Sequence, residues 1–292
     1  MAEIATAGAM GRVRSKGRDH IIDVLIEERA PKWSSSPLWP LLRPALYGIL
    51  DYGKAVRMAD TIAPLGGRPA LDFISDLLAL KVAARGLERT PPKGRLIIIA
   101  NHPTGIGDGI AVYDAFKAVR PDIVFYANSD AHRVCPRFDE VLIPVEWVEE
   151  KRTRDRTRLT LSMTREAMEA ERALMVFPAG RLARKGPDGK LEDPEWMPTA
   201  VSIARKYGAP ILPVHLDGPW STLFHFFNDF SRELRDITLF HELLNKRGRP
   251  FALTIGPLIP AEALDLDAAK ATLALKDYIS RVLPADPDAP FA

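Results

Sequence analysis

Short, continuous apolar runs alternate with amphipathic segments along the last two thirds of the chain. Residues 111–119, 159–171 and 198–207 carry apolar side chains at helical spacing, and a further helix is predicted at 268–282. The apolar runs predict strands at 96–99, 123–126, 141–145, 174–177, 211–215 and 251–255. Runs without polar alternation are typical of strands covered on both faces. The succession therefore predicts an α/β fold with a mostly parallel sheet flanked by helices.

The first third of the chain has a different pattern of apolar residues, which is typical of helices. Apolar side chains recur at helical spacing over residues 71–82, and an apolar segment at 39–50 precedes them, which indicates a pair of helices. A proline cluster at 90–94 then marks a boundary. We expect a flexible N-terminus at 1–19, an N-terminal helical arm at 20–90 and an α/β domain at 91–292.

The segment between the strands predicted at 211–215 and 251–255 is too long for a plain loop. It spans about 35 residues, so inserted helices are favoured. The segment is rich in phenylalanine, at positions Phe224, Phe226, Phe227, Phe230 and Phe240. These rings predict either ordinary core packing or contact with an acyl chain or a membrane interface.

Charge and composition exclude several classes of protein. The 292 residues include 40 Lys and Arg against 38 Asp and Glu, a net charge of +2, which is too balanced for a dedicated nucleic-acid binder. The single cysteine, Cys135, excludes an internal disulfide and a cysteine-rich zinc site. Asp130, His132 and Cys135 together supply too few ligands, so we predict no metal site.

The chain offers no segment typical of a membrane span. The best N-terminal candidate, at 37–50, is short and is broken by Pro40, Arg43 and Pro44, whereas a spanning helix needs roughly 18 to 20 apolar residues. The first thirty residues also lack the apolar core of a signal peptide. We therefore expect neither a spanning helix nor export by a cleaved signal.

The turn at 101–109 carries the first candidate chemistry. The strand predicted at 96–99 leads directly into Asn-His-Pro-Thr-Gly-Ile-Gly-Asp-Gly, and functional groups gather at the carboxyl ends of strands in open α/β sheets. His102 followed by Asp108 has the parts of a general base and its orienting acid. No serine or cysteine stands beside them, which favours direct activation of a substrate hydroxyl or amine. Two alternatives are a simple helix cap at Asp108 and a dinucleotide-binding glycine turn.

A second candidate stretch lies at 176–186, again at the end of a predicted strand. A tight turn there is followed by Arg181, Arg184 and Lys185. Cations in this position are suited to an anionic head group or a phosphopantetheine arm. The alternative is a solvated basic loop.

Four sequence blocks together resemble the lysophospholipid/glycerolipid acyltransferase family. They are Asn-His-Pro-x-Gly-x-x-Asp-Gly at 101–109, Phe-Pro-Ala-Gly at 177–180, Asp-Pro-Glu-Trp at 193–196 and Gly-Ala-Pro-Ile-Leu-Pro-Val at 208–214. Their order and spacing agree over roughly residues 93–218. The nearest branch is the bacterial hemolysin-like acyltransferases, which include lyso-ornithine-lipid O-acyltransferases.

The resemblance implies roles for individual residues. The family's catalytic histidine falls on His102 and its acid on Asp108, with five residues between them where most members have four. His102 is then expected to deprotonate a lysolipid hydroxyl that attacks the thioester of acyl carrier protein or acyl-CoA, with no other cofactor. The matching blocks also predict substrate-binding residues, namely Asn101, Gly105, Gly107, Phe177, Pro178, Gly180, Arg181 and Arg184.

One departure from the family pattern bears on the acceptor. The usual Phe-Pro-Glu-Gly-Thr-Arg block, whose Glu and Arg bind the acceptor's phosphate, has Ala179 for the Glu and an arginine displaced to Arg181. This favours a lyso-aminolipid, such as lyso-ornithine lipid, over lysophosphatidic acid. Synthesis of phosphatidic acid, hydrolysis of a lipid or thioester, and lipid binding without catalysis stay open as alternatives.

A lipid acceptor and a thioester donor have to meet at a membrane surface. The resemblance and the N-terminal helices together predict peripheral contact with the cytoplasmic face of the inner membrane of a bacterium. The expected partners are therefore the lysolipid, the acyl donor and the membrane, and nucleic acid is not among them.

Overall fold

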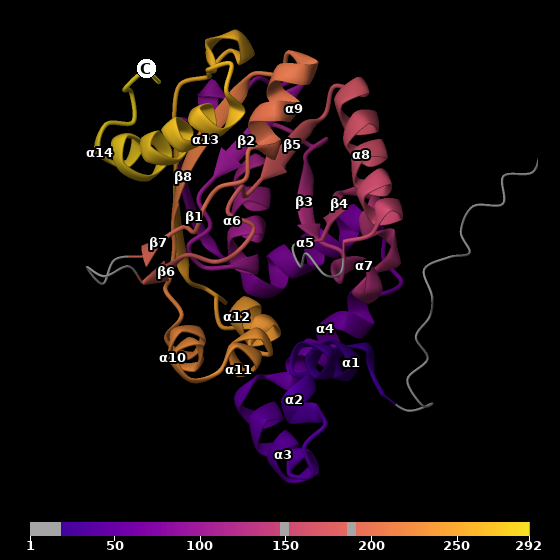
Figure 1. Cartoon of the computed structure of the whole chain (residues 1–292). Coiled ribbons are helices and arrows are strands. Elements are labelled where there is room, and N and C mark those ends of the chain that lie inside the picture. Colours follow the sequence, from indigo (N-terminus) through magenta and orange to yellow (C-terminus); the bar gives the residue numbers. More distant parts are fainter. Residues whose placement is uncertain (1–18, 147–151, 186–190, 292) are drawn as a thin grey trace, which may run out of the picture.

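The computed structural model describes residues 19–146, 152–185 and 191–291 (Figure 1). Apart from Asp19, the flexible N-terminus expected at 1–19 lies outside the described residues.

A seven-stranded sheet in the order β1-β9-β8-β2-β5-β3-β4 forms the centre of the described molecule. The strands are β1 (Lys81–Arg85), β2 (Leu96–Ala100), β3 (Val124–Asn128), β4 (Leu142–Val145), β5 (Ala173–Val176), β8 (Ile211–Asp217) and β9 (Pro250–Ile255). All neighbouring pairs are parallel except β8 and β9, which are antiparallel. The predicted α/β fold with a mostly parallel sheet is confirmed.

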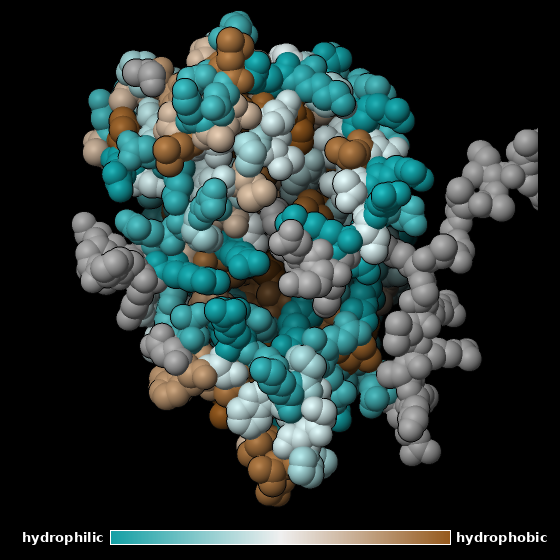
Figure 2. Space-filling model, viewed as in Figure 1, coloured by the Kyte–Doolittle hydropathy of each residue, from teal (hydrophilic) through white to brown (hydrophobic). Residues whose placement is uncertain are grey.

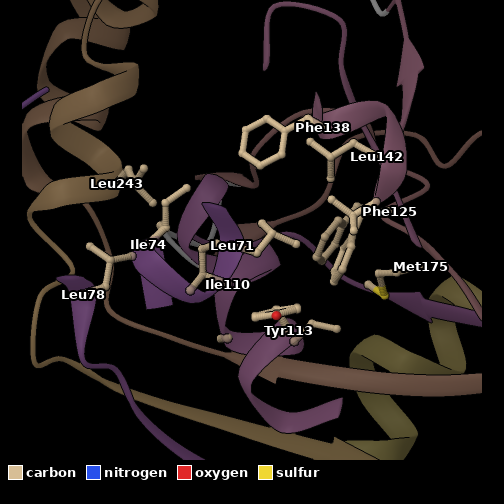
Figure 3. Close-up of a cluster of buried hydrophobic side chains, with 14 of the residues drawn as sticks. Leu71, Ile74, Leu78, Ile110, Tyr113, Phe125, Phe138, Leu142, Met175 and Leu243 are labelled. Atoms are coloured by element: carbon tan, nitrogen blue, oxygen red, sulfur yellow. The ribbon is translucent and has the colours of Figure 1, made fainter. Parts of the chain in front are cut away.

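Helices cover the sheet on both faces because each central strand is apolar on both sides. In β2, Leu96 and Ile98 belong to one buried cluster, and Ile97 and Ile99 belong to a second one. The helices that contribute to the first cluster include α5 (Gly67–Leu78) and α6 (Ile106–Phe116), and Figure 3 shows part of it. Those of the second include α8 (Arg154–Glu169), α9 (Thr199–Tyr207) and α13 (Ala268–Asp277). The strand alternation thus builds two cores, one on each face of the sheet.

The N-terminal region is helical, as predicted, but it ends in a strand. Its helices are α1 (Ile21–Arg29), α2 (Pro31–Ser34), α3 (Trp39–Ile49), α4 (Tyr52–Ile62) and α5. The helical spacing predicted over 71–82 is wrong beyond Leu78, because Ala79 adopts a left-handed φ of 44° and Val82 lies in β1. β1 lies at the edge of the sheet and pairs with β9.

Inserted helices fill the segment between β8 and β9, as predicted. They are α10 (Thr222–Phe230), α11 (Arg232–Asp236) and α12 (Leu239–Leu244). Phe240 is buried, whereas Phe226 and Phe230 are exposed on α10. The prediction of core packing is therefore confirmed for Phe240 and wrong for Phe226 and Phe230.

Two predicted helices have different bounds in the structure. The helix expected at 111–119 is α6, which begins at Ile106 and ends at Phe116. The terminal helix expected at 268–282 is α-helical only to Asp277 and continues as a wider π-type turn over Tyr278–Val282. Among the described residues, no helix is both long and apolar enough to cross a bilayer.

Candidate active site

The turn between β2 and α6 places His102 beside Asp108. β2 ends at Ala100 in the middle of the sheet, between β8 and β5, and α6 begins at Ile106. Gly105 makes the connection with a φ of 98°, a conformation that side chains with a Cβ rarely adopt. The chain thereby folds back, so that the first turn of α6 returns to His102, the second residue after the strand.

Asp108 is a fully buried carboxylate with four hydrogen-bond donors around it. Its Oδ2 lies 2.9 Å from Nδ1 of His102 and accepts from the amides of Thr104 at 2.9 Å and Gly105 at 3.1 Å. Its Oδ1 accepts from the Thr104 hydroxyl. The amide of Gly105 is the N-cap donor of α6. Asp108 therefore caps the helix and orients the histidine at once, and the two interpretations of this residue are compatible.

The hydrogen bond to Asp108 decides which nitrogen of His102 can accept a proton. A carboxylate only accepts hydrogen bonds, so Nδ1 carries the proton and Nε2 presents its lone pair. Nε2 makes no hydrogen bond with any described residue, and the side chain of His102 is 16% exposed. Phe177 stacks on the imidazole at 4.3 Å between ring centroids, with 23° between the planes. The arrangement is that of a general base with an accessible nitrogen.

Asn101 ties the same turn to the neighbouring strand. Its Nδ2 donates to the carbonyl of Leu216 at 2.8 Å, and its Oδ1 accepts from the Leu216 amide at 2.7 Å. Leu216 lies in β8. The side-chain amide of Asn101, predicted to bind substrate, thus hydrogen-bonds the end of β2 to β8 next to His102.

The segment after β5 packs directly on the turn. Ala183 donates its amide to the carbonyl of His102 at 3.0 Å, and Leu182 lies so close to Gly105 that a Cβ there would come within 3.0 Å of Leu182 Cδ2. Gly180 has a φ of 59° and closes a turn with Phe177, whose carbonyl accepts the Gly180 amide at 3.0 Å. The structure thus brings the predicted Phe177–Gly180 turn to the histidine.

The first turn of α6 also contacts the insertion between β8 and β9. A Cβ at Gly107 would lie 3.1 Å from Cγ of Lys246. Lys246 is buried and pairs with buried Glu242 at 3.3 Å between Nζ and Oε2. Burial lowers the pKa of Lys246, and Glu242 and Asp108 oppose that effect. Sequence patterns did not identify Lys246, because nothing near it in the chain belongs to the turn at 101–109.

Asp193 is a further residue of the site that the sequence reasoning missed. Its two carboxylate oxygens accept from the backbone amide of His102 at 3.1 and 3.2 Å, and Oδ2 accepts from Nε1 of Trp196 at 2.9 Å. Burial raises the pKa of Asp193, and His102 and Trp196 oppose this. The signal in the sequence is the Asp-Pro-Glu-Trp block at 193–196, to which the sequence alone assigns no role.

Comparison with known proteins gives a family match over the central part of the chain. Residues 81–217 match the family described as Acyltransferase. This segment holds β2, the His102–Asp108 pair and the strands on both sides of β2.

Residues 81–217 form an acyltransferase domain.

Relatives with assigned names point the same way. Two are named lyso-glycine lipid O-acyltransferase. The one from Phocaeicola vulgatus is 26% identical over 224 residues, covering 73% of this chain and 77% of the relative. The one from Bacteroides thetaiotaomicron is 23% identical over 220 residues, covering 73% of this chain and 79% of the relative.

The crystal structure of the 1-acyl-sn-glycerophosphate acyltransferase PlsC from Thermotoga maritima aligns with 18% identity and a TM-score of 0.48, covering 89% of this chain and 97% of that one. The family match and the two named relatives confirm the resemblance to acyltransferases.

Four arginines gather beside the turn of this acyltransferase. Arg181 and Arg184 flank Leu182 and Ala183, the two residues that contact Gly105 and His102. Arg232 and Arg235 come from α11, and their charges act on Arg184 together with that of Arg181. Burial lowers the pKa of Arg184, and these three cations lower it further.

Among the described residues, only Arg235 of these four has side-chain hydrogen-bond or ion-pair partners. Arg235 donates to Asn228 and Asp236, whereas among the described residues no ion pair neutralises Arg181, Arg184 or Arg232. The cluster therefore carries excess positive charge next to the histidine. The two arginines of α11 were not predicted from sequence.

Proposed function

We propose that this acyltransferase moves a fatty acyl group from an acyl thioester to the hydroxyl of a lysolipid. The observation that carries the proposal is the 2.9 Å contact between His102 Nδ1 and Asp108 Oδ2, which leaves Nε2 accessible. No side chain among the described residues hydrogen-bonds to Nε2 of His102, and such a base is suited to activating an acceptor hydroxyl directly. The names of the two relatives, both O-acyltransferases of a lysolipid, support an acceptor of this class.

The reaction follows from the position of the proton on His102. Nε2 takes the proton of the lysolipid hydroxyl while the hydroxyl oxygen forms a bond to the thioester carbonyl carbon. The C–S bond then breaks, and the leaving thiolate receives the proton from the imidazolium. Asp108 stays ionised and stabilises the imidazolium between the two steps. No cofactor is required beyond the thioester co-substrate, either acyl carrier protein or acyl-CoA.

Three observations favour an acceptor with an amino-acid head group. Ala179 stands where the family pattern has the glutamate of its phosphate-binding block. The relatives are named for a glycine lipid, and glycine presents a carboxylate. The arginines at 181, 184 and 232 form no ion pair with any residue that the structure describes, and guanidinium groups bind carboxylates in a bidentate manner. A lyso-aminolipid, such as a lyso-glycine or lyso-ornithine lipid, therefore fits this chain better than lysophosphatidic acid.

Exposed apolar side chains at one end of the molecule support peripheral contact with a membrane. Leu38, just before α3, is exposed together with Leu41 and Ile49 of the helix. α10 exposes Phe226 and Phe230, with 77% exposure at Leu41 and 72% at Phe230. Figure 1 shows both helices at the same end, and Figure 2 shows apolar side chains gathered there. Large apolar side chains exposed together mark a lipid or protein contact. In the proposed setting this end faces the cytoplasmic leaflet of the inner membrane.

The decisive experiment is mass spectrometry of the lipids formed by purified protein. Acyl carrier protein and coenzyme A thioesters are each offered with lyso-glycine lipid, lyso-ornithine lipid or lysophosphatidic acid. We expect diacylated aminolipid from wild type and from D114N, a matched carboxylate change farther along α6, and none from folded H102A. Diacyl product only from lysophosphatidic acid would replace the aminolipid proposal. Release of free fatty acid alone would indicate a hydrolase, and no product from any pair would indicate a binding protein.

A further inference from the structure

Two residues that border the small β6–β7 hairpin hold the backbone of His102. β6 (Arg184–Lys185) and β7 (Leu191–Glu192) pair in antiparallel fashion. Ala183, just before β6, donates its amide to the carbonyl of His102, and Asp193, just after β7, accepts the amide of His102 with its carboxylate. Both backbone polar groups of the histidine are thus satisfied by one distant segment, with Asp193 separated from His102 by 91 positions.

These two hydrogen bonds satisfy backbone groups of His102 that the sheet leaves unpaired. Beyond Ala100, β2 no longer pairs with β8 or β5, so the amide of His102 has no ladder partner. A buried or half-buried amide requires an acceptor, and an ionised carboxylate is a strong one. Asp193 therefore determines where the peptide plane of His102 lies, and with it the direction in which the imidazole leaves the backbone.

Asp193 is itself fixed from two sides. Trp196, a core residue that is 5% exposed, donates Nε1 to Oδ2 of Asp193. Lys276, on α13, donates Nζ to the carbonyls of Asp193 at 2.8 Å and Pro194 at 3.0 Å. The carboxylate is therefore anchored to the second core and cannot follow a displaced histidine.

The charge of Asp193 also bears on the reaction. His102 alternates between neutral and positively charged forms during acyl transfer, and its charge acts on Asp193. Asp108 is on one side of the imidazole, and Asp193 contributes a second negative charge at the backbone. A negative charge near an imidazole favours the imidazolium, which is the form that must persist until the thiolate leaves.

We propose that Asp193 is a positioning residue for acyl transfer, which fixes the backbone of His102 between β2 and the β6–β7 hairpin and supports the imidazolium by its charge. This role rests on the proposed function, because it acts through His102. It also gives a physical reason for the Asp-Pro-Glu-Trp block, in which the aspartate holds the histidine and the tryptophan holds the aspartate.

The test compares D193N with E195Q in the purified full chain. Asparagine keeps the shape of the side chain but loses the charge, and Glu195 is an exposed carboxylate in the same block, so E195Q is the matched control. We expect kcat of D193N to fall about tenfold, as for a partial loss of general-base catalysis. The KM of each substrate should stay within about twofold of the wild-type value. The acidic limb of its pH profile should move to lower pH, while E195Q behaves as wild type.

A readout without activity accompanies the kinetics. The ring nuclei of His102, assigned by their absence in H102Q, are followed by NMR as a function of pH. In D193N the midpoint should move to lower pH, because the imidazolium has lost a neighbouring negative charge. A folded D193N with unchanged kcat, pH profile and ring titration overturns the proposal.

The remaining outcomes are also decisive. If D193N loses thermal stability while its kcat per folded molecule and its pH profile stay as in wild type, Asp193 is structural only and the proposal is wrong. Failure of both D193N and D193A to fold leads to the same conclusion. If wild type and E195Q transfer no acyl group, the proposed function itself fails, whereas an active wild type with a wild-type-like D193N overturns only the role of Asp193.

Discussion

Gly105 and Leu182 are in such close contact that no side chain fits between them. A Cβ at position 105 would lie 3.0 Å from Leu182 Cδ2, and the φ of 98° at Gly105 is itself unfavourable for any other residue. Gly105 is also the N-cap of α6 and donates its amide to Asp108. One glycine thus joins the helix that carries the acid to the loop that carries the arginines.

G105A is therefore expected to impair both folding and catalysis. The backbone strain alone is of order 1–3 kcal/mol, and the displaced Leu182 would disturb Ala183 and its bond to His102. We expect a lower melting temperature and a lower kcat. G94A is the control, since Gly94 has a φ of 86° but nothing within 4 Å of its missing Cβ. If the two variants retain equal kcat, close contact at Gly105 does not matter for catalysis.

D108N separates the two functions of the acid. An asparagine can place only one oxygen where Asp108 accepts four hydrogen bonds, so one buried donor loses its partner, which costs about 1–3 kcal/mol. The imidazole also loses the carboxylate that fixes its tautomer, and we expect kcat to fall by about a hundredfold or more. Denaturant unfolding and kcat are measured on the same preparation. Retention of wild-type kcat in D108N would contradict the assignment of the dyad.

The sequence was informative where the determinants are local. The apolar runs of the central strands are buried on both faces, so each run predicted its strand within about two residues. His102 and Asp108 are close in the chain, and the strand end before them indicated a site. β1 was missed because an edge strand with mostly exposed side chains, Lys81–Arg85, carries no continuous apolar run.

The parts of the site that were missed are held together only by tertiary packing. Asp193 reaches His102 across 91 positions, and Arg232 lies in a helix of five residues whose pattern indicates a solvated turn. Lys246 is buried and paired with buried Glu242, and no apolar pattern in the sequence marks its position. Charged side chains that gather in space without a sequence motif leave no periodic signal, so the structure is required to find them.

The arginine cluster is expected to act on acceptor binding rather than on chemistry. Loss of one charge-assisted hydrogen bond costs about 1.5–3 kcal/mol, so R184A and R232A should raise the KM of the aminolipid about tenfold or more with little change in kcat. R158A removes an exposed arginine from α8 and serves as the control. If the KM of the acyl donor rises instead, the cluster binds the phosphates of the donor.

Membrane contact is tested by placing charge on the apolar end. L41D on α3 and F230D on α10 should each reduce co-sedimentation with vesicles of anionic phospholipid by about tenfold, because a buried apolar side chain contributes about 1.5–3 kcal/mol. L273D is the matched control. Leu273 is 69% exposed on α13, which Figure 1 shows at the opposite end of the molecule. Equal binding by all three variants would exclude this end as the contact.

Stability should fall with acidification because His132 is a half-buried ring whose Nδ1 is shielded from solvent. Burial lowers its pKa below the ordinary 6.5, and Nδ1 has no hydrogen-bond partner among the described residues. The unfolded chain takes up a proton below that pH while the folded chain does not, so stability is present above about 6.5 and is lost as the pH falls further. His215, whose pKa burial also lowers, adds to the effect. H132Q, which does not titrate, should therefore lose less melting temperature than wild type between about pH 7.5 and 5.5. An equal loss in both proteins would show that His132 does not couple folding to pH.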